Sequence, residues 1–444
     1  MPRVLLLLPT TTYRTEAFVA AASSLGVDVT VASERPNTLA RLNPTALLTL
    51  DFQNPPEAAN RVVEFSTSHT IDAVVSVDSQ VVVLGAAISA ALGLRHNSVQ
   101  SATAAHDKHQ MRQRFKQAGV PSPPFMLGSL DEDRAAMASR VDFPCVVKPL
   151  SLAASQGVIR ADDEKQFIRA VNRLESILNV ELAKSTATDD SGTSSQTRAT
   201  ASWRQFLVEQ FVAGPEVALE GMLKGGELSV LALFDKPDPL EGPFFEETIY
   251  VTPSRLPAKA QAEIASCAEH AAEALGLTEG PVHAELRFAE NGPSVIEVNA
   301  RSIGGLCSRA LRFGDGMSLE ELIIRSALDG TCELPSREEK ASGVMMIPTT
   351  RAGRFITVDG LSDAKAVQGI EELTILAHAR QPLVPLPEGG RYLGFIFARG
   401  ETPAAVESAL RASQSKLRFE IEPFTDSEAA SLGLPRLSKK RLNP

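Results

Sequence analysis

The stretch VHAELRFAENGPSVIEVNAR, residues 282–301, limits the fold more than any other part of the chain. Asn-Gly between two apolar, alternating runs is a strong local signal for a β-hairpin, so we expect strands over 283–289 and 294–301. A turn of three residues, Glu-Asn-Gly, would place Glu285 directly opposite Glu297. Directly opposed residues of an antiparallel pair share a face, and two like charges there are unfavourable. The hairpin therefore calls for a cation, or for open solvent, on that face.

A divalent metal ion between the two acids would remove their repulsion. His283 and Asn299 form the next opposed pair on this face, and Arg301 follows them. Carboxylate and amide oxygens suit Mg²⁺, which usually binds one or two carboxylates together with substrate phosphates. The pattern therefore predicts a triphosphate nearby. For His283 the sequence leaves open a place on the metal face and a structural role behind it, and a solvated strand face is the alternative for the two acids alone.

A triphosphate site also needs cations and a loop whose backbone approaches the phosphates closely. Lys148 ends a predicted buried strand, FPCVVKP, and precedes the small-residue loop SLAASQGV. Lys108 lies on a helix that the pattern predicts over 103–118, stopped by Gly119. The sequence has no GxxxxGK[ST] motif, so an ATP site here is not a P-loop. An edge lysine and a solvated helix face are the alternatives for Lys148 and Lys108.

The length of 444 residues predicts about three domains. Strand–helix alternation over the first ~100 residues is typical of a parallel α/β sheet, so we expect a Rossmann-like N-terminal domain over 1–103. No GxGxxG occurs there, and dinucleotide binding has no support. We expect a second domain over 104–335, with a lid over about 145–205 that includes a mobile loop at 183–202. A separate α+β domain is expected over 336–444.

Composition argues against several other classes of protein. A net charge of −10 is unfavourable for an extended nucleic-acid surface, and 43% hydrophobic with 22% charged residues is ordinary for a globular chain. The apolar run 4–8 is too short for a signal peptide or a membrane span, which favours a cytoplasmic protein. The four cysteines are widely spaced and form no CxxC, so we expect packing residues and neither a disulfide scaffold nor a zinc site.

Five short motifs occur in one order: Asp107-Lys108, VVKP at 146–149 with its loop, VEQFVAGPEV at 208–217, HAELR at 283–287 and EVNAR at 297–301. Through them the chain resembles ATP-grasp enzymes over nearly its whole length. It is most similar to their L-amino-acid ligase and carnosine-synthase-like branch, because a glycine-bearing turn follows EVNAR and RYLGFIFARGETPAAVESAL stands in the tail. The resemblance implies a multidomain α/β and α+β fold with an N-terminal Rossmann-like domain and a mobile lid. One departure is that SLAASQGV keeps only Gly157, whereas the family's phosphate loops usually carry two or three glycines.

The resemblance also assigns roles to single residues. It implies ATP binding by Lys108, Lys148, Ser155, Gln156, Gly157, Glu209, Gln210, Phe211, Val212 and Glu216, with the adenine edge at 209–212 and the ribose at Glu216. It implies two Mg²⁺ ions, or Mn²⁺, held by Glu285, Glu297 and Asn299. Arg301 would be the catalytic residue that steadies the acyl-phosphate and the tetrahedral intermediate. Substrate contacts are expected from Glu247, Tyr250, Arg301, Ser302, Gly304 and Gly305, whereas Asp78 is interpreted as the cap of the next helix.

The expected activity is ATP-dependent formation of an amide bond between a carboxylate and an amine, both from amino acids, through an acyl-phosphate. Other hypotheses stay open: a carboxylase or purine-pathway ligase that uses carboxyphosphate or formyl-phosphate, a nucleotide-binding module without catalysis, and a scaffold protein. NARSIGGL stands where the biotin-carboxylase-like EHxVTE would follow the second acid, which favours peptide-like ligation. Neither a nucleic acid nor a membrane is expected as a partner, and a homodimer is implied by the resemblance alone.

Overall fold

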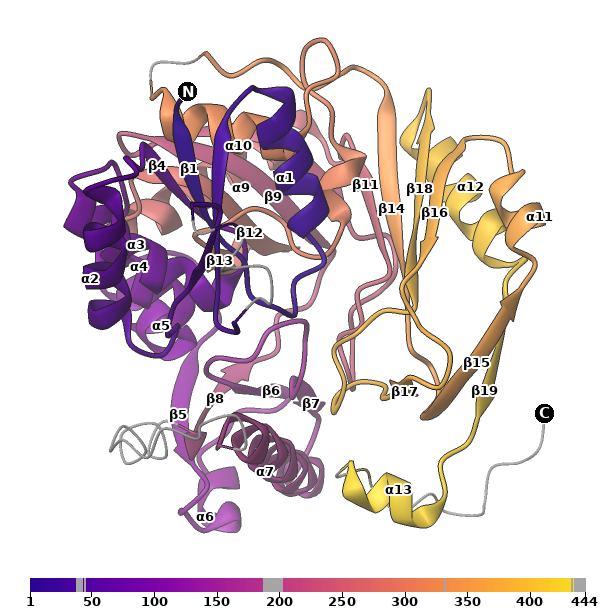
Figure 1. Ribbon diagram of the computed structural model, residues 1–444. Helices are drawn as coiled ribbons and strands as arrows, with labels where there is room; N and C mark the ends of the chain where they lie inside the picture. The colour runs from indigo at the N-terminus through magenta and orange to yellow at the C-terminus, as the bar shows by residue number, and fades with distance from the viewer. Residues whose placement is uncertain (37–42, 44, 187–202, 331–332, 433, 435–444) are drawn as a thin grey trace.

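The computed structural model describes residues 1–36, 43, 45–186, 203–330, 333–432 and 434. At its N-terminus four parallel strands pair in the order β3-β2-β1-β4, as the strand–helix alternation predicted (Figure 1). The elements are β1 (Arg3–Leu7), α1 (Thr15–Ser24), β2 (Asp28–Ser33), β3 (Leu47–Thr49), α2 (Pro55–Ser66), β4 (Ala73–Ser76), the 3-10 turn η1 (Ser79–Val81) and α3 (Val82–Leu92). Alternate residues of β1 pack against α1 on one face and against α2 and α3 on the other. Burial on both faces explains the unbroken apolar run of this strand.

The single helix predicted over 103–118 is wrong, because Asp107 divides it. Helix α4 (Val99–His106) ends at Asp107, and α5 (Lys108–Ala118) begins directly after it. The Asp107 carboxylate accepts hydrogen bonds from two N–H groups of the next turn, at 2.9 and 3.0 Å, and so caps α5. The break places Lys108 at the first position of α5, where its own N–H donates to a carbonyl of the loop after β6.

A smaller sheet with the order β5-β8-β6-β7 packs against α7 and has its own hydrophobic core. Its elements are β5 (Phe125–Ser129), α6 (Arg134–Ala138), β6 (Cys145–Pro149), β7 (Ile159–Ala161), α7 (Glu164–Thr186) and β8 (Gln205–Gln210). We call this part the lid sheet. The loop predicted at 183–202 begins inside α7, because good helix formers continue the helix there, and its residues 187–202 lie outside the described residues.

Eight antiparallel strands form the largest sheet, in the order β13-β12-β9-β10-β11-β14-β18-β16. They are β9 (Glu216–Lys224), β10 (Glu227–Asp235), β11 (Ile249–Thr252), β12 (Glu279–Ala289), β13 (Gly292–Asn299), β14 (Ala341–Ile347), β16 (Ile370–Ile375) and β18 (Gly394–Gly400). The large sheet therefore contains strands from both sides of the predicted boundary. Pairing of β11 with β14 makes the hydrogen bonding continuous from the central strands into the tail. The domain boundary near 335 stays a prediction.

Helices and one further sheet complete the fold. The sheet has the order β17-β15-β19. The remaining elements are α9 (Ala258–Leu275), η2 (Cys307–Ala310), α10 (Leu319–Leu328), β15 (Gly353–Asp359), α11 (Leu361–Lys365), β17 (Pro382–Leu383), α12 (Pro403–Gln414), β19 (Arg418–Glu422) and α13 (Asp426–Ser431). The apolar face of α9 covers β9, β12 and β13. Within the described ranges, no helix has the length and apolar character that a bilayer crossing requires.

The hairpin β12–β13 confirms the predicted pairs, although its turn differs from the prediction. Glu285 lies opposite Glu297, and His283 lies opposite Asn299. The turn has two residues and not three, because Ala289 pairs with Gly292, whose φ of 102° suits glycine. A β-bulge beside Glu285 then shifts the register by one residue. The shorter turn and the bulge cancel each other, so both acids still share one face.

Candidate active site

A cavity of about 320 Å³ lies where the N-terminal unit, the lid sheet and the large sheet meet. This volume is in the range of small-molecule sites. Most of the predicted site residues line the cavity: Lys108, Lys148, Ser155, Glu209, Gln210, Phe211, Val212, Glu216, Glu247, Tyr250, Glu285, Glu297, Asn299, Arg301, Gly304 and Gly305. Three others, Gln156, Gly157 and Ser302, are not part of its lining. The fold thus gathers residues from five separate segments of the chain.

The two opposed acids are held ionised by cations around them. Lys108 Nζ lies 3.3 Å from Glu297 Oε1. Burial disfavours the charged form of Glu297, but Lys108, Lys148 and Arg301 together outweigh it and hold the pKa of this carboxyl below its usual range. Burial also opposes ionisation of Glu285, yet Lys236 and His283 keep its pKa low. With the amide oxygen of Asn299 beside them, two carboxylates form a donor set that fits a hard divalent cation.

Lys236, which was not predicted from the sequence, pairs with three acids of the candidate site. Its Nζ lies 2.7 Å from Glu216 Oε1 and 3.5 Å from Glu285 Oε2, and it also forms an ion pair with Glu247. Carboxylate oxygens of these three acids lie within 4.8 Å of one another. Burial opposes the charge of Lys236, but the three carboxylates raise its pKa well above the usual range. Residue 236 lies beside Glu216 because a bulge in β10 shifts the β9–β10 register. The position of this bulge could not be predicted from the sequence.

Lys148 is neutralised from the side of the lid sheet. Its Nζ lies 2.5 Å from Glu209 Oε2, and Arg112 Nε lies 2.6 Å from the other oxygen of Glu209. Burial lowers the pKa of Lys148, while Glu209 acts against that shift. The Glu209 carboxylate is therefore engaged by two cations, so its side chain supports Lys148. Arg112, which is fully buried on α5, had not been singled out.

Three family models match successive parts of the chain. They are an ATP-grasp N-terminal domain at 19–96, an ATP-grasp domain at 141–310 and an L-amino acid ligase C-terminal domain 2 at 345–422. The chain belongs to the ATP-grasp superfamily. The family and the L-amino-acid ligase branch that the motifs predicted are confirmed, because the C-terminal match is to a domain of L-amino acid ligases.

Known proteins extend this assignment. Alanine–anticapsin ligase of Bacillus subtilis (strain 168) is 29% identical over 292 residues, which are 62% of this chain and 58% of that protein. Carnosine synthase 1 of Gallus gallus is 30% identical over 192 residues, 42% of this chain and 20% of that protein. The matched region spans only about six-tenths of the length of the first curated relatives: 62% of an uncharacterized protein of Sinorhizobium fredii and 58% of the alanine–anticapsin ligase. A crystal structure of L-amino acid ligase from Bacillus licheniformis has a TM-score of 0.75 at 24% identity, covers 95% of this chain and 99% of that one, and confirms the ATP-grasp fold.

The small-residue loop of this ATP-grasp chain has an unusual backbone. Ala154, Ser155 and Gly157 have positive φ angles of 53°, 55° and 74°. A Cβ at position 157 would lie 2.9 Å from a carbon of Leu174, so only glycine fits there. Within the described residues, the N–H groups of 153–155 donate to no protein acceptor, and all three residues line the cavity. Successive backbone N–H groups in such a conformation form a concave site for an anion.

Arg301 is held by two hydrogen bonds and keeps one nitrogen toward the cavity. Its Nε donates to Ser79 Oγ (2.7 Å) and its Nη1 donates to the Ser302 carbonyl (2.8 Å). Among the described residues, its Nη2 has no protein partner. Ser302 itself turns away, because its Oγ accepts a hydrogen bond from the buried Arg14 (2.8 Å). The substrate contact predicted for Ser302 stays a prediction, and the Ser302 carbonyl accepts a hydrogen bond that orients Arg301.

Three other side chains take positions that the sequence left open or misread. Asp78 occupies the N-cap position of η1, as interpreted, but its side chain makes no capping hydrogen bond and lines the cavity. His283 is buried between Glu220 (3.2 Å) and Glu285 (3.4 Å), behind the metal face. Tyr250 donates a hydrogen bond of 2.7 Å to Glu247. Glu247 therefore faces the cavity with its orientation fixed from two sides, by Lys236 and by this phenol.

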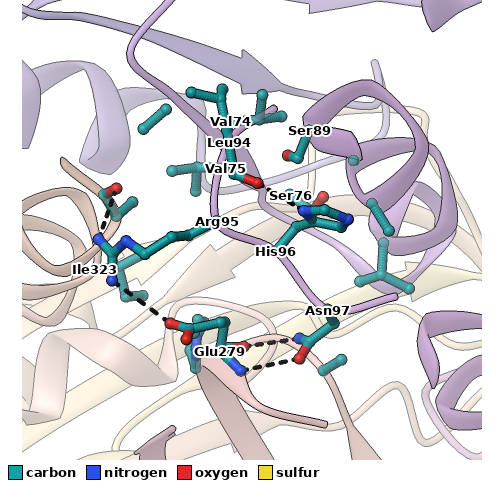
Figure 2. A pocket seen from close by; sticks show the side chains of 18 of the residues that line it. Val74, Val75, Ser76, Ser89, Leu94, Arg95, His96, Asn97, Glu279 and Ile323 are labelled. Atoms are coloured by element: carbon teal, nitrogen blue, oxygen red, sulfur yellow. Dashed lines mark hydrogen bonds and ion pairs between the residues drawn. The ribbon is translucent and has the colours of Figure 1, made fainter. Parts of the chain in front are cut away.

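A second cavity of about 120 Å³ lies between β4, α3 and the start of β12 (Figure 2). Its polar groups are already paired. Arg95 donates to the carbonyl of Ser326 (2.9 Å) and forms an ion pair with Glu279 (3.5 Å). Asn97 donates to the Glu279 carbonyl (2.7 Å), as Figure 2 shows. These contacts join the N-terminal unit to the large sheet, and we assign no ligand to this cavity.

Proposed function

We propose that this ATP-grasp chain is an ATP-dependent carboxylate–amine ligase that joins two amino acids through an acyl-phosphate. The observation that carries the proposal is the face shared by Glu285, Glu297, Asn299 and Arg301 in one cavity with Lys108 and Lys148. Phosphoryl transfer needs positioning and electrostatic stabilisation and no protein nucleophile, in agreement with this set of residues. The L-amino acid ligase C-terminal domain supports amino acids as substrates.

The nucleotide phosphates would lie between Lys108, Lys148 and the free N–H groups of 153–155. Lys108 Nζ also donates a hydrogen bond to the carbonyl of Leu152 (3.0 Å). This lysine would therefore supply positive charge to the phosphates and also fix the position of the small-residue loop. The segment Glu209–Val212 would meet the adenine edge. Glu216, whose two oxygens bind Lys236 and Arg287, would keep a free lone pair on each oxygen for the ribose hydroxyls.

Glu285, Glu297 and Asn299 would hold two Mg²⁺ ions, with Mn²⁺ as a substitute. The bound ions would neutralise charge on the transferring phosphoryl group. The protein fixes the two carboxylates by strand pairing on β12 and β13, and it keeps them ionised through Lys108 and Lys236.

The chemistry then consists of two displacements. An oxygen of the donor carboxylate attacks the γ-phosphorus and ADP leaves, which forms the acyl-phosphate. The acceptor amine attacks the acyl carbon, Arg301 donates from Nη2 to the oxyanion, and inorganic phosphate leaves as the amide forms. Glu247 has a carboxylate that suits the α-ammonium of the acyl donor, beside Tyr250 and the turn at Gly304–Gly305.

The test is ADP release with ATP and Mg²⁺ against amino acids, first singly and then in pairs, with the Glu297→Ala variant beside the wild type. We expect release that requires two amino acids and is lost in the variant. Release that responds to bicarbonate or formate would indicate the carboxylase or purine-pathway chemistry in its place. ATP binding without release under any of these conditions would support a nucleotide-binding module or scaffold. The homodimer and the cytoplasmic location stay predictions.

A further inference from the structure

The small-residue loop 151–158, called the phosphate loop from here on, is tied to the C-terminal part of the chain, and the tie uses two loop residues that do not line the cavity. Gly157 N–H donates to the carbonyl of Pro387 (2.9 Å), and Gln156 Nε2 donates to the carbonyl of Glu388 (2.9 Å). Gly390 stands close behind, since a Cβ there would lie 3.5 Å from that of Ala154. The segment 385–390, between β17 and β18, thus lies against the outer side of the loop (Figure 1).

An ion pair closes the same contact. Arg173 of α7 donates two parallel hydrogen bonds to Glu388, from Nε to Oε1 (2.6 Å) and from Nη2 to Oε2 (2.9 Å). The Glu388 side chain is only 9% exposed, so solvent screens this pair less than an open surface pair. Paired bonds from a guanidinium to a carboxylate also fix direction as well as distance. The guanidinium of Arg173 stacks over Phe244 (4.8 Å), three residues before Glu247.

The loop needs such outside support because its sequence gives it little of its own. Ala154 and Ser155 adopt a left-handed conformation that glycine would adopt without strain. Only two hydrogen bonds lie within the loop, from Gln156 N–H to Ala153 and from Val158 N–H to Ser155. Lys108 holds the inner side through Leu152, so the outer side depends on the C-terminal segment.

We propose that the C-terminal segment 385–389 positions the phosphate loop over the nucleotide, with Glu388 and Arg173 as positioning residues. This inference rests on the proposed function, since it gives the loop an ATP phosphate to meet. Gln156 and Gly157 then act as anchors, and the N–H groups of 153–155 face the phosphates. The tether takes the place of the glycines that this loop lacks.

The experiment compares Glu388→Ala, Arg173→Ala and their combination with a matched control, Glu175→Ala. Glu175 lies on the same helix and also pairs with an arginine, Arg134 (2.6 Å), but this pair is internal to the lid sheet. Two quantities are measured: hydrogen–deuterium exchange of the peptide 150–158 without nucleotide, and the dissociation constant of MgATP by calorimetry. Neither measurement requires the amino-acid substrates.

We expect faster exchange in both single variants and an ATP affinity on the order of tenfold weaker. The double variant should bind ATP no more weakly than Arg173→Ala, because Glu388→Ala removes an ion pair that Arg173→Ala has already removed. Arg173→Lys should fall in between, and Glu175→Ala should equal the wild type. Unchanged exchange, or faster exchange with unchanged ATP affinity, would overturn the positioning role. A wild-type protein that binds no ATP would contradict the proposed function itself. The hydrogen–deuterium exchange data test only the positioning of the loop and not the proposed function.

Discussion

Replacement of Lys236 by methionine tests the electrostatic design of the site. Methionine keeps the length of the side chain and removes the charge, which lies among three carboxylates with only 3% of the side chain exposed. Two of the acids keep another partner, since Arg287 binds Glu216 (2.9 Å) and the His283 ring lies beside Glu285 (3.4 Å). Glu247 loses the only cation with which it is paired in the described structure.

The expected loss of stability follows from that one uncompensated acid. Breaking a buried ion pair by removal of one partner typically costs about 3–5 kcal/mol, and we expect about 3 kcal/mol at pH 8. Burial already raises the pKa of Glu247, Glu285 adds to this effect, and Lys236 opposes it. Without Lys236 the folded-state pKa of Glu247 rises further above its unfolded value. Stability is then retained at low pH, where Glu247 is protonated in both states, and is lost as the pH rises.

The assay is urea unfolding followed by far-ultraviolet circular dichroism at pH 5 and at pH 8. Lys259→Met serves as the control, because that side chain is 90% exposed and its ion pair with Glu263 contributes little. We expect a clear deficit for Lys236→Met at pH 8, a smaller deficit at pH 5 and none for the control. A variant that unfolds within about 1 kcal/mol of the wild type at pH 8, or one with its larger deficit at pH 5, would refute the reasoning.

Two further predictions concern catalysis and the cysteines. Arg301→Ala should lower kcat for ligation by roughly 10²–10³-fold with little change in ATP affinity, because Arg301 Nη2 is placed to donate to the oxyanion. Steady-state kinetics with an active amino-acid pair would measure this effect. A loss of kcat below about tenfold would argue against this role of Arg301. Burial raises the pKa of Cys145 to about 12 and that of Cys267 to about 11, and burial also raises the pKa of Cys307. Native protein treated with iodoacetamide at pH 8 should therefore show no modification of these three residues by mass spectrometry, and rapid modification of any of them would contradict their role in packing.

Local sequence patterns were sufficient to predict features that depend only on the pairing of neighbouring strands. The pairing of Glu285 with Glu297 follows from hairpin alternation, and it held because the turn and the bulge shifted the register in opposite directions. Asp107 shows the limit of periodicity, since one capping side chain divided a helix whose pattern runs through it. A polar residue inside a periodic segment is therefore a sign that the helix can begin again there.

Contacts between distant segments were beyond the sequence. Arg112 and Glu209 are 97 positions apart, and Lys236 meets acids from three separate strands and loops. No sequence motif around Arg112 or around Lys236 indicates that these residues belong to the candidate site. The anchoring of Gln156 to Glu388, across 232 positions, is likewise visible only in the folded chain. The glycine-poor loop was a visible departure from the family, but the reason for it lay in the C-terminal segment.

The central claim is that the donor carboxylate is activated as an acyl-phosphate. The most direct measurement uses an amino-acid pair that supports ADP release, with the donor carboxylate labelled with ¹⁸O, and determines the mass of the released phosphate. Attack of a carboxylate oxygen on the γ-phosphorus carries that oxygen into the phosphate when the amide forms. We predict one ¹⁸O atom in each phosphate released from labelled donor. Phosphate without label, formed at the same rate as the dipeptide, would contradict the account.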